Sequence, residues 1–132
     1  MNRKIFLSLV SIVAISIGTF ALLFPSILII DVKMAIPSET ANVMARTVGV
    51  LLIAFGVLNY LIRGQRDSQT FRSILIANLL LQLGLVPIDV FAYFSGVFLT
   101  LGSFLPNTIL HLVLAGGFVY YLKEMKTHGE TE

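Results

Sequence analysis

The chain has 132 residues, of which 57% are hydrophobic and only 12% are charged, and its formal net charge is +2. Soluble domains typically carry about 25% charged residues, so this composition argues strongly against an ordinary soluble enzyme. The absence of cysteine excludes disulfides, iron–sulfur clusters and thiolate metal sites, and so small a net charge indicates no nucleic-acid partner. We therefore expect an integral membrane protein whose first partner is the lipid bilayer.

Four segments are apolar enough to cross a membrane, which takes about 20 residues for about 30 Å of hydrocarbon. In chain order they cover residues 5–30, 41–62, 73–94 and 107–122, and a polar tail follows at 126–132. They predict an all-α fold, a four-transmembrane-helix bundle that forms a single membrane domain over residues 1–132. The first segment starts like a signal peptide, but its apolar run continues to Ile30, so we expect it to stay uncleaved.

The basic residues predict the orientation of this bundle. Seven of them fall on the side of the N-terminus: Arg3, Lys4, Arg63, Arg66, Arg72, Lys123 and Lys126. Only Lys33 and Arg46 fall on the opposite side. Because short cytoplasmic loops are enriched in Lys and Arg, we expect both termini in the cytoplasm.

Proline and turn residues mark the predicted helix boundaries. Phe24-Pro25 predicts a kink or an end late in the first helix. Ser38 is the predicted N-cap of the second helix, and the polar turn over residues 64–70 makes helices two and three antiparallel neighbours. Pro106 predicts the start of the last helix, whereas Pro87 either bends the third helix or ends it early.

Four polar side chains fall at one depth near the outer side of the membrane: Arg46, Asp89, Asn107 and His111. At 1.5 Å per helical residue, Arg46 and Asp89 each lie about 25 Å from the inner basic residues. Three interpretations remain open. An Arg46–Asp89 pair could tie helices two and three together. The four groups could instead form a polar pocket for a ligand or a proton, or Arg46 could reach the headgroups by itself.

A second set of polar side chains follows the third predicted helix. Asn78, Gln82 and Asp89 lie within about 60° of one another at 100° per residue, so their common face should point into protein rather than lipid. Asn59 and Asn78 both lie near the inner boundary, which predicts a hydrogen bond across the hairpin. We expect interhelical contacts from Asn59, Asn78 and Gln82, and a path for protons or a polar solute is the alternative.

Small residues recur at a spacing of seven on two of the helices. Gly49 and Gly56 lie on the second helix, and Ser11 and Gly18 lie on the first. Such faces allow two helix backbones to approach closely. The pattern fits packing within one bundle and the interface of a homo-oligomer equally well.

The residues needed for common intramembrane cofactors are missing. Haem with two histidine ligands needs a second intramembrane histidine, but His128 lies in the tail. A retinal Schiff base needs a lysine within a span, and the predicted spans have none. No nucleotide-binding or metalloprotease motif occurs in the sequence. We expect no cofactor, no metal and no catalytic residue.

The stretch from Ala45 to Arg63 starts with Ala-Arg-Thr-Val-Gly and continues through an apolar run to Phe-Gly-Val-Leu-Asn-Tyr. With Phe24-Pro25 before it and His111 early in the last helix, it resembles the DoxX-like group of small bacterial membrane proteins. The resemblance covers most of the chain. It implies a bacterial inner-membrane four-helix protein without an established reaction, and it draws attention to Arg46, Gly49, Gly56 and His111.

Together these features predict a non-enzymatic membrane protein, either an accessory subunit of a larger membrane complex or a self-associating homo-oligomer. The alternative is a binder or carrier of a small lipophilic molecule at the outer pocket of Arg46, Asp89, Asn107 and His111. An enzyme that uses Asp89 and His111 as acid and base on such a molecule is the third hypothesis.

Overall fold

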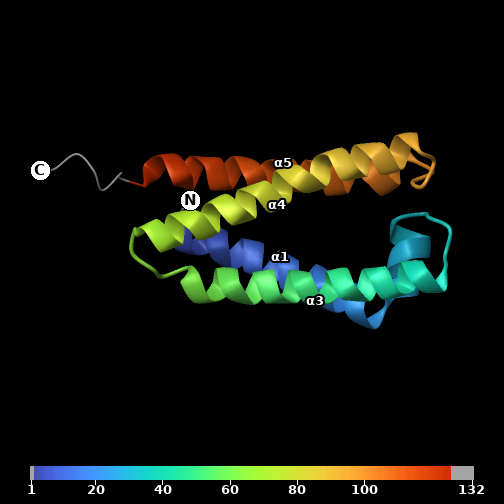
Figure 1. Ribbon diagram of the computed structural model, residues 1–132, viewed down its shortest axis with the longest axis horizontal. Coiled ribbons are helices and arrows are strands. Elements are labelled where there is room, and N and C mark those ends of the chain that lie inside the picture. Colours follow the sequence, from blue (N-terminus) through green and yellow to red (C-terminus); the bar gives the residue numbers. More distant parts are fainter. Residues whose placement is uncertain (1, 126–132) are drawn as a thin grey trace, which may run out of the picture.

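The computed structural model describes residues 2–125, and the predicted polar tail at 126–132 lies outside the described residues. The described chain is all-helical and has no strand, which confirms the all-α part of the predicted fold class. Its elements, in chain order, are α1 (Arg3–Leu23), α2 (Pro25–Ile27), the short π-helix η1 (Leu28–Val32), α3 (Glu39–Ile62), α4 (Gln69–Phe94) and α5 (Leu101–Glu124). Figure 1 shows α1, α3, α4 and α5 as four long rods.

These four helices are each long and apolar enough to cross a membrane. Three of them extend a few residues beyond the predicted spans 41–62, 73–94 and 107–122. The first is shorter than predicted, because α1 ends at Leu23 and the mainly apolar residues from Pro25 to Val32 form α2 and η1. Hydropathy therefore located every long helix but did not show this break, which Phe24-Pro25 indicated instead.

Each of the four long helices begins with a polar side chain that accepts a hydrogen bond from the first turn. The predicted cap is present: the Ser38 hydroxyl accepts from the backbone N–H of Ala41 at 3.0 Å. The same role falls to Asn2, Ser68 and Thr100. These caps satisfy N–H groups that the helix itself leaves without partners, which fixes where each helix starts.

The prolines act differently from one another. Phe24 leaves the helical conformation, with φ −127° and ψ 52°, and Pro25 opens the short α2, so α1 ends there rather than bending. Pro87 lies inside α4, which continues to Phe94, so the hypothesis of an early helix end is wrong. Pro106 also lies inside a helix: Thr100 caps α5 six residues earlier, so the predicted start at Pro106 is wrong.

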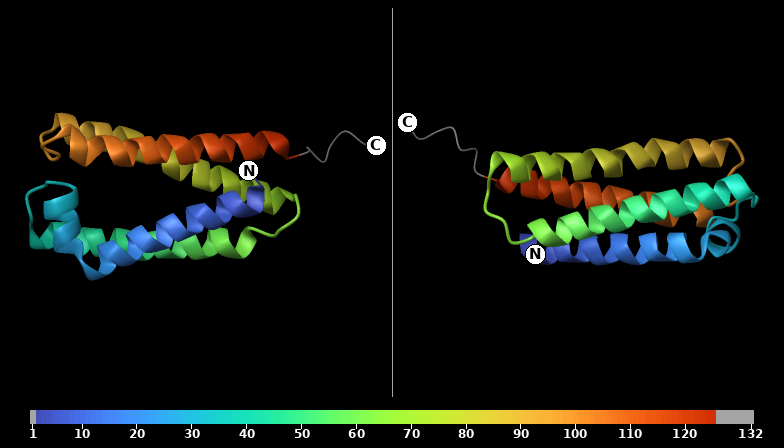
Figure 2. Two further views of the ribbon diagram at one scale, coloured as in Figure 1. Left: turned by 180° about the vertical axis from the view of Figure 1, so that it is seen from behind. Right: turned by 60° about the horizontal axis from the view of Figure 1, so that its bottom comes forward.

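The four long helices form two hairpins. α1 packs along α3, and α4 packs along α5; we call these pairs the first and the second hairpin. Figure 1 and the left view of Figure 2 show that α3 and α4 are antiparallel and diverge from the connection that joins them. The expectation that α3 and α4 would be neighbours is therefore correct only close to their connection. Along most of their length α3 packs against α1, and α4 packs against α5.

The two ends of the molecule differ in what fills them. Asn2, Met125 and the connection at 63–68 lie together at one end, which we call the termini end. Its core contains apolar residues from all four long helices: Phe6, Leu7, Val10, Ile62, Phe71, Leu75, Phe118, Tyr121 and Met125. The far end, with the connections at 24–38 and 95–100, holds the buried Asp89 instead.

Glycines allow α1 and α3 to lie almost backbone to backbone. A methyl group added at Gly49 would lie 2.6 Å from the Gly18 carbonyl oxygen, and one at Gly18 would lie 2.7 Å from the Gly49 carbonyl oxygen. Two helical turns away, towards the termini end, the Ser11 hydroxyl on α1 donates to the Gly56 carbonyl on α3 at 2.6 Å. The faces of small residues recognised in the sequence thus pack against each other inside one chain, and these four residues are not free to form a surface between copies.

Candidate functional site

A network of polar side chains joins α4 to α5 near the far end. The Asp89 carboxylate on α4 accepts from the Asn107 amide at 2.7 Å and from the Thr108 hydroxyl at 3.2 Å. The same Asn107 nitrogen lies 3.1 Å from His111 Nε2, and His111 Nδ1 lies 2.6 Å from Gln82 Oε1. We call these five residues the far-end network. It contains three of the four residues that the sequence placed at this depth.

The partners of His111 define its protonation. The Asn107 amide nitrogen can only donate, so Nε2 must accept, and the Gln82 oxygen can only accept, so Nδ1 must donate. This arrangement describes a neutral imidazole with its proton on Nδ1. A proton on Nε2 would face another donor and break the Asn107 contact. Both ring nitrogens are therefore occupied inside the network.

Burial separates the two sides of this network. Asp89 is 7% exposed and Gln82 is 8% exposed, and Thr108 is also buried. Asn107 and His111 are only half-buried. A carboxylate at this depth is costly without donors, and here two donors from α5 satisfy it. The network thus has a buried part, formed by Gln82, Asp89 and Thr108, and a more accessible edge, formed by Asn107 and His111.

Lys33, in the connection before α3, faces this network from the first hairpin. Its ammonium lies 5.1 Å from the centroid of the Phe98 ring and interacts electrostatically with both Asp89 and His111. Burial lowers the pKa of the Lys33 ammonium below its ordinary value, and the Asp89 carboxylate offsets part of that effect. In the sequence Lys33 counted only as an outer topology charge, and no local signal, with Asp31 two residues before it, indicated that it would be buried.

A second contact between the two connections lies close by. The Thr100 hydroxyl, which caps α5, donates to the Met34 sulfur at 3.3 Å. Met34 itself has a φ of 49°, a left-handed conformation that is uncommon for a residue other than glycine. The two connections therefore touch at the far end, and this contact holds the segment that carries Lys33 against the second hairpin.

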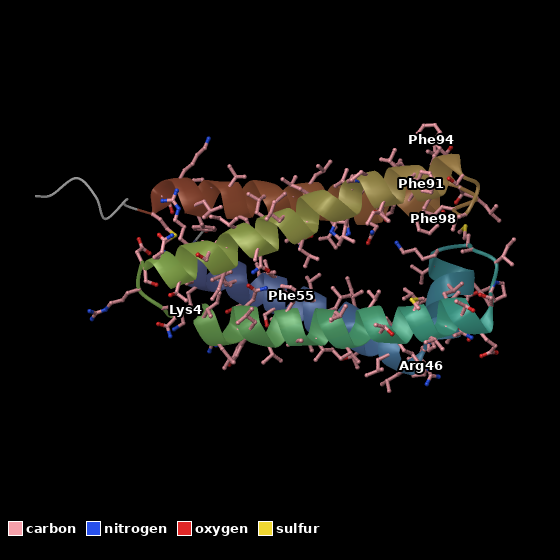
Figure 3. All side chains as sticks on the ribbon, in the orientation of Figure 1. Lys4, Arg46, Phe55, Phe91, Phe94 and Phe98 are labelled. Carbon is pink, nitrogen blue, oxygen red and sulfur yellow. The ribbon has the colours of Figure 1, made fainter. Side chains whose placement is uncertain are left out.

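Arg46 is not part of the network. Its side chain is exposed, Figure 3 shows it pointing away from α4 and α5, and it forms no hydrogen bond or ion pair with residues 2–125. The expected Arg46–Asp89 pair is thus not formed. Counting residues gives depth along a helix but not direction: at 100° per residue, Arg46 lies about 140° around α3 from Asn59, which faces α4. Of the three interpretations drawn from the sequence, contact of Arg46 with headgroups is the one that agrees with this geometry.

The predicted bond between Asn59 and Asn78 is present. The Asn59 amide donates to Asn78 Oδ1 at 2.8 Å, and both side chains are 1% exposed. The Asn78 amide donates in turn to the Ile74 carbonyl at 2.9 Å, while Asn59 Oδ1 has no partner among the described residues. Asn78 bonds towards α3 and Gln82 towards α5, so the stripe on α4 divides into two separate contacts rather than one continuous path.

Within residues 2–125, no group of three or more His, Asp or Glu side chains could hold a metal ion. Comparison of the chain with known protein families, curated proteins and solved structures finds no match. The resemblance to the DoxX-like group stays a prediction, and of its four residues Gly49 and Gly56 serve helix packing while His111 belongs to the far-end network.

Proposed function

We propose that this chain is a multi-pass protein of a bacterial inner membrane with both termini in the cytoplasm. The distribution of charge supports this orientation: six described basic residues lie at the termini end, Arg3, Lys4, Arg63, Arg66, Arg72 and Lys123. Lys33 and Arg46 lie at the far end, and Lys126 is outside the described residues. In this orientation the far-end network lies at the level of the outer leaflet.

The function that we propose is the binding of a small lipophilic molecule whose polar head lies at the far-end network. One observation carries this proposal: the buried Asp89 carboxylate lies beside the half-buried Asn107 and His111, and the Lys33 ammonium is near enough to interact with it electrostatically but forms no ion pair with it. Opposite charges that are desolvated but apart favour a polar group that can donate to one and accept from the other. A head group with both functions would complete the site.

Binding is favoured over catalysis by the hydrogen bonds of His111. An acid or base must have a nitrogen available to the substrate. Both imidazole nitrogens of His111 contact other side chains, and the Asp89 carboxylate already accepts from two donors. The network is therefore built to hold its groups in place rather than to exchange a proton with a substrate.

Native mass spectrometry of the protein in a mild detergent tests this function. We expect the wild type to retain a small molecule, and Lys33→Met and Asp89→Asn to lose it. Arg46→Met is the matched control, since it removes a cation at the same end but outside the network. An empty wild-type protein, or equal loss of the molecule in the control, would contradict the proposal.

Association with another membrane protein or a second copy is the second candidate function, and Arg46 is the observation in its favour. Its exposed guanidinium lies on α3, a helix apolar enough to span a membrane, and charged groups within spans usually find partners. The same spectra report the oligomeric state. A wild-type complex that dissociates in Arg46→Met supports association. If the wild type and Arg46→Met are both monomers, association is excluded.

A further inference from the structure

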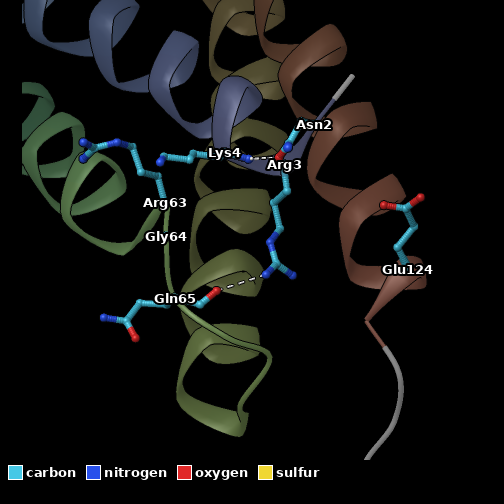
Figure 4. A pocket seen from close by; sticks show the side chains of 7 residues that line it. All are labelled: Asn2, Arg3, Lys4, Arg63, Gly64, Gln65 and Glu124. Carbon is cyan, nitrogen blue, oxygen red and sulfur yellow. Dashed lines mark hydrogen bonds between the residues drawn. The ribbon is translucent and has the colours of Figure 1, made fainter.

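A depression of about 470 Å³ opens at the termini end, far from the network described above. It lies between the start of α1, the connection after α3 and the last turn of α5 (Figure 4). Three cations line it, Arg3, Lys4 and Arg63, and Glu124 is the one acidic residue among its lining residues. Segments distant in sequence thus bring positive charge together around one surface hollow.

The charges around this depression are not balanced. Arg3 pairs with Asp67 and also donates to the Gln65 carbonyl at 3.0 Å. That pair is the only one within residues 2–125, so Lys4 and Arg63 have no described carboxylate partner. Glu124 lies across the depression from both cations in Figure 4, and its carboxylate accepts from the Tyr120 hydroxyl at 2.5 Å.

The direction of α1 adds to this positive potential. The N-terminus of a helix carries a partial positive charge, where acidic residues are favourable and basic residues are not. The first turn of α1 has no acidic residue, and it contains Arg3 and Lys4. Asp67 offsets the charge of Arg3, but Lys4 in the same turn and Arg63 from another segment have no acidic partner among residues 2–125, which is costly unless an anion binds there.

We propose that this depression binds the phosphate of an anionic membrane lipid, with Lys4 and Arg63 as its direct ligands. The inference relies on the proposed orientation, which puts the depression at the level of the inner-leaflet headgroups, where basic sites bind acidic lipids. A lipid fits better than free phosphate because Ile5 and Leu61, close in sequence to the two cations, are exposed apolar side chains at the same end. They offer the surface that an acyl chain needs.

The test is a lipid titration of the full chain in a neutral detergent, followed by native mass spectrometry. The probes are phosphatidylglycerol, phosphatidylcholine and inorganic phosphate. The variant is the double substitution Lys4→Gln with Arg63→Gln. The matched control is Arg66→Gln with Lys123→Gln, which removes two exposed cations from the same end without touching the lining of the depression.

We expect wild type and control to bind phosphatidylglycerol equally, and the variant to bind it roughly tenfold more weakly. Binding should return in Lys4→Arg with Arg63→Lys, which keeps both charges, and circular dichroism should show equal helix content in all four proteins. Equal weakening in variant and control indicates diffuse attraction and overturns the proposal. So does equal binding of phosphatidylcholine, or displacement of the lipid by inorganic phosphate alone.

Failure of this proposal is distinguishable from failure of the proposed function. The lipid titration is carried out in detergent and reads a phosphatidylglycerol mass, whereas the far-end site is read by a co-purified molecule that Lys33→Met releases. The double variant at the termini end should leave that molecule bound.

Discussion

The two hairpins hold their helices together through different kinds of contact. In the first hairpin, Gly18 and Gly49 let the backbones of α1 and α3 touch, and one hydroxyl, that of Ser11, donates across the contact. In the second hairpin, α4 and α5 are joined by the hydrogen bonds of the far-end network and by the stacked rings of Tyr93 and Phe104, 5.2 Å between centroids.

This difference indicates where function is to be sought. Close packing of small residues joins helices in a membrane without burying any charge, and it needs no further explanation. A carboxylate between two helices is expensive in the same environment, and neutral side chains could have joined α4 to α5 more cheaply. The contrast supports the proposal of a ligand site at the second hairpin, with the first hairpin as its scaffold.

The largest effect that we expect comes from the first hairpin. In Gly49→Ala the new methyl group would meet the backbone of Gly18 and Leu22, at 2.6 Å from the Gly18 oxygen and 2.8 Å from the Leu22 nitrogen. Since backbone atoms cannot step aside, the free energy of unfolding should fall by about 2–3 kcal/mol. Denaturation in mild detergent, followed by circular dichroism, measures the change.

Gly116→Ala on α5 is the matched control for this substitution. A methyl group there has no neighbour within 4 Å, so the helix should gain up to about 1 kcal/mol from the better propensity of alanine. If both variants lost the same stability, backbone contact would not be what distinguishes the first hairpin.

The second prediction concerns coupling within the far-end network. Asp89→Leu and Asn107→Leu remove the two ends of one hydrogen bond, so a double-mutant cycle should give a coupling energy of about 1–2 kcal/mol. The same cycle between Asp89→Leu and Arg46→Leu should give less than about 0.5 kcal/mol, because these side chains do not meet. Strong coupling to Arg46 would restore the pair expected from depth alone.

These two predictions also show what the sequence could and could not provide. Span positions and the buried face of Asn78, Gln82 and Asp89 follow from hydropathy and helical period, which act along one chain. The direction of Arg46 was missed because depth was counted without its angle around the helix. The position of Lys33 was missed because it depends on a contact between two connections, far apart in sequence, that no local pattern records.

Some helix boundaries could be predicted from the sequence and others could not. Ser38 predicted the start of its helix correctly, because a cap acts on the next few residues. Pro87 did not end its helix and Pro106 did not start one, because a helix tolerates an internal proline when neighbouring structure compensates for the missing N–H. Pairing of helices was the least predictable feature: a short turn joins α3 to α4, but the glycines of α3 face α1.

A third prediction addresses the contact between the hairpins. Asn78→Leu leaves both polar ends of the buried Asn59 amide without partners, whereas Asn59→Leu also removes an oxygen that already has none. Asn78→Leu should therefore cost about 1 kcal/mol more stability than Asn59→Leu. The two free energies of unfolding, measured side by side, check this order, and equal losses would mean that Asn59 Oδ1 is satisfied.

The smallest effect that we expect is the pH dependence of stability contributed by Lys33. It tests whether a charged group of the first hairpin faces the far-end network. Burial lowers the pKa of Lys33 from its ordinary value of 10.5 in the folded protein, so in the range just below 10.5 the unfolded chain binds more protons than the folded one. Stability must then rise as the pH increases through that range.

Other groups titrate there too, so the readout is the difference between wild type and Lys33→Met, taken from unfolding curves at about pH 7.5 and about pH 10. The wild type should gain stability relative to the variant as the pH rises, because deprotonation relieves a buried charge that Asp89 offsets only in part. A difference that stays constant with pH would place the ammonium in water, and Lys33 would then not face the network as a desolvated cation.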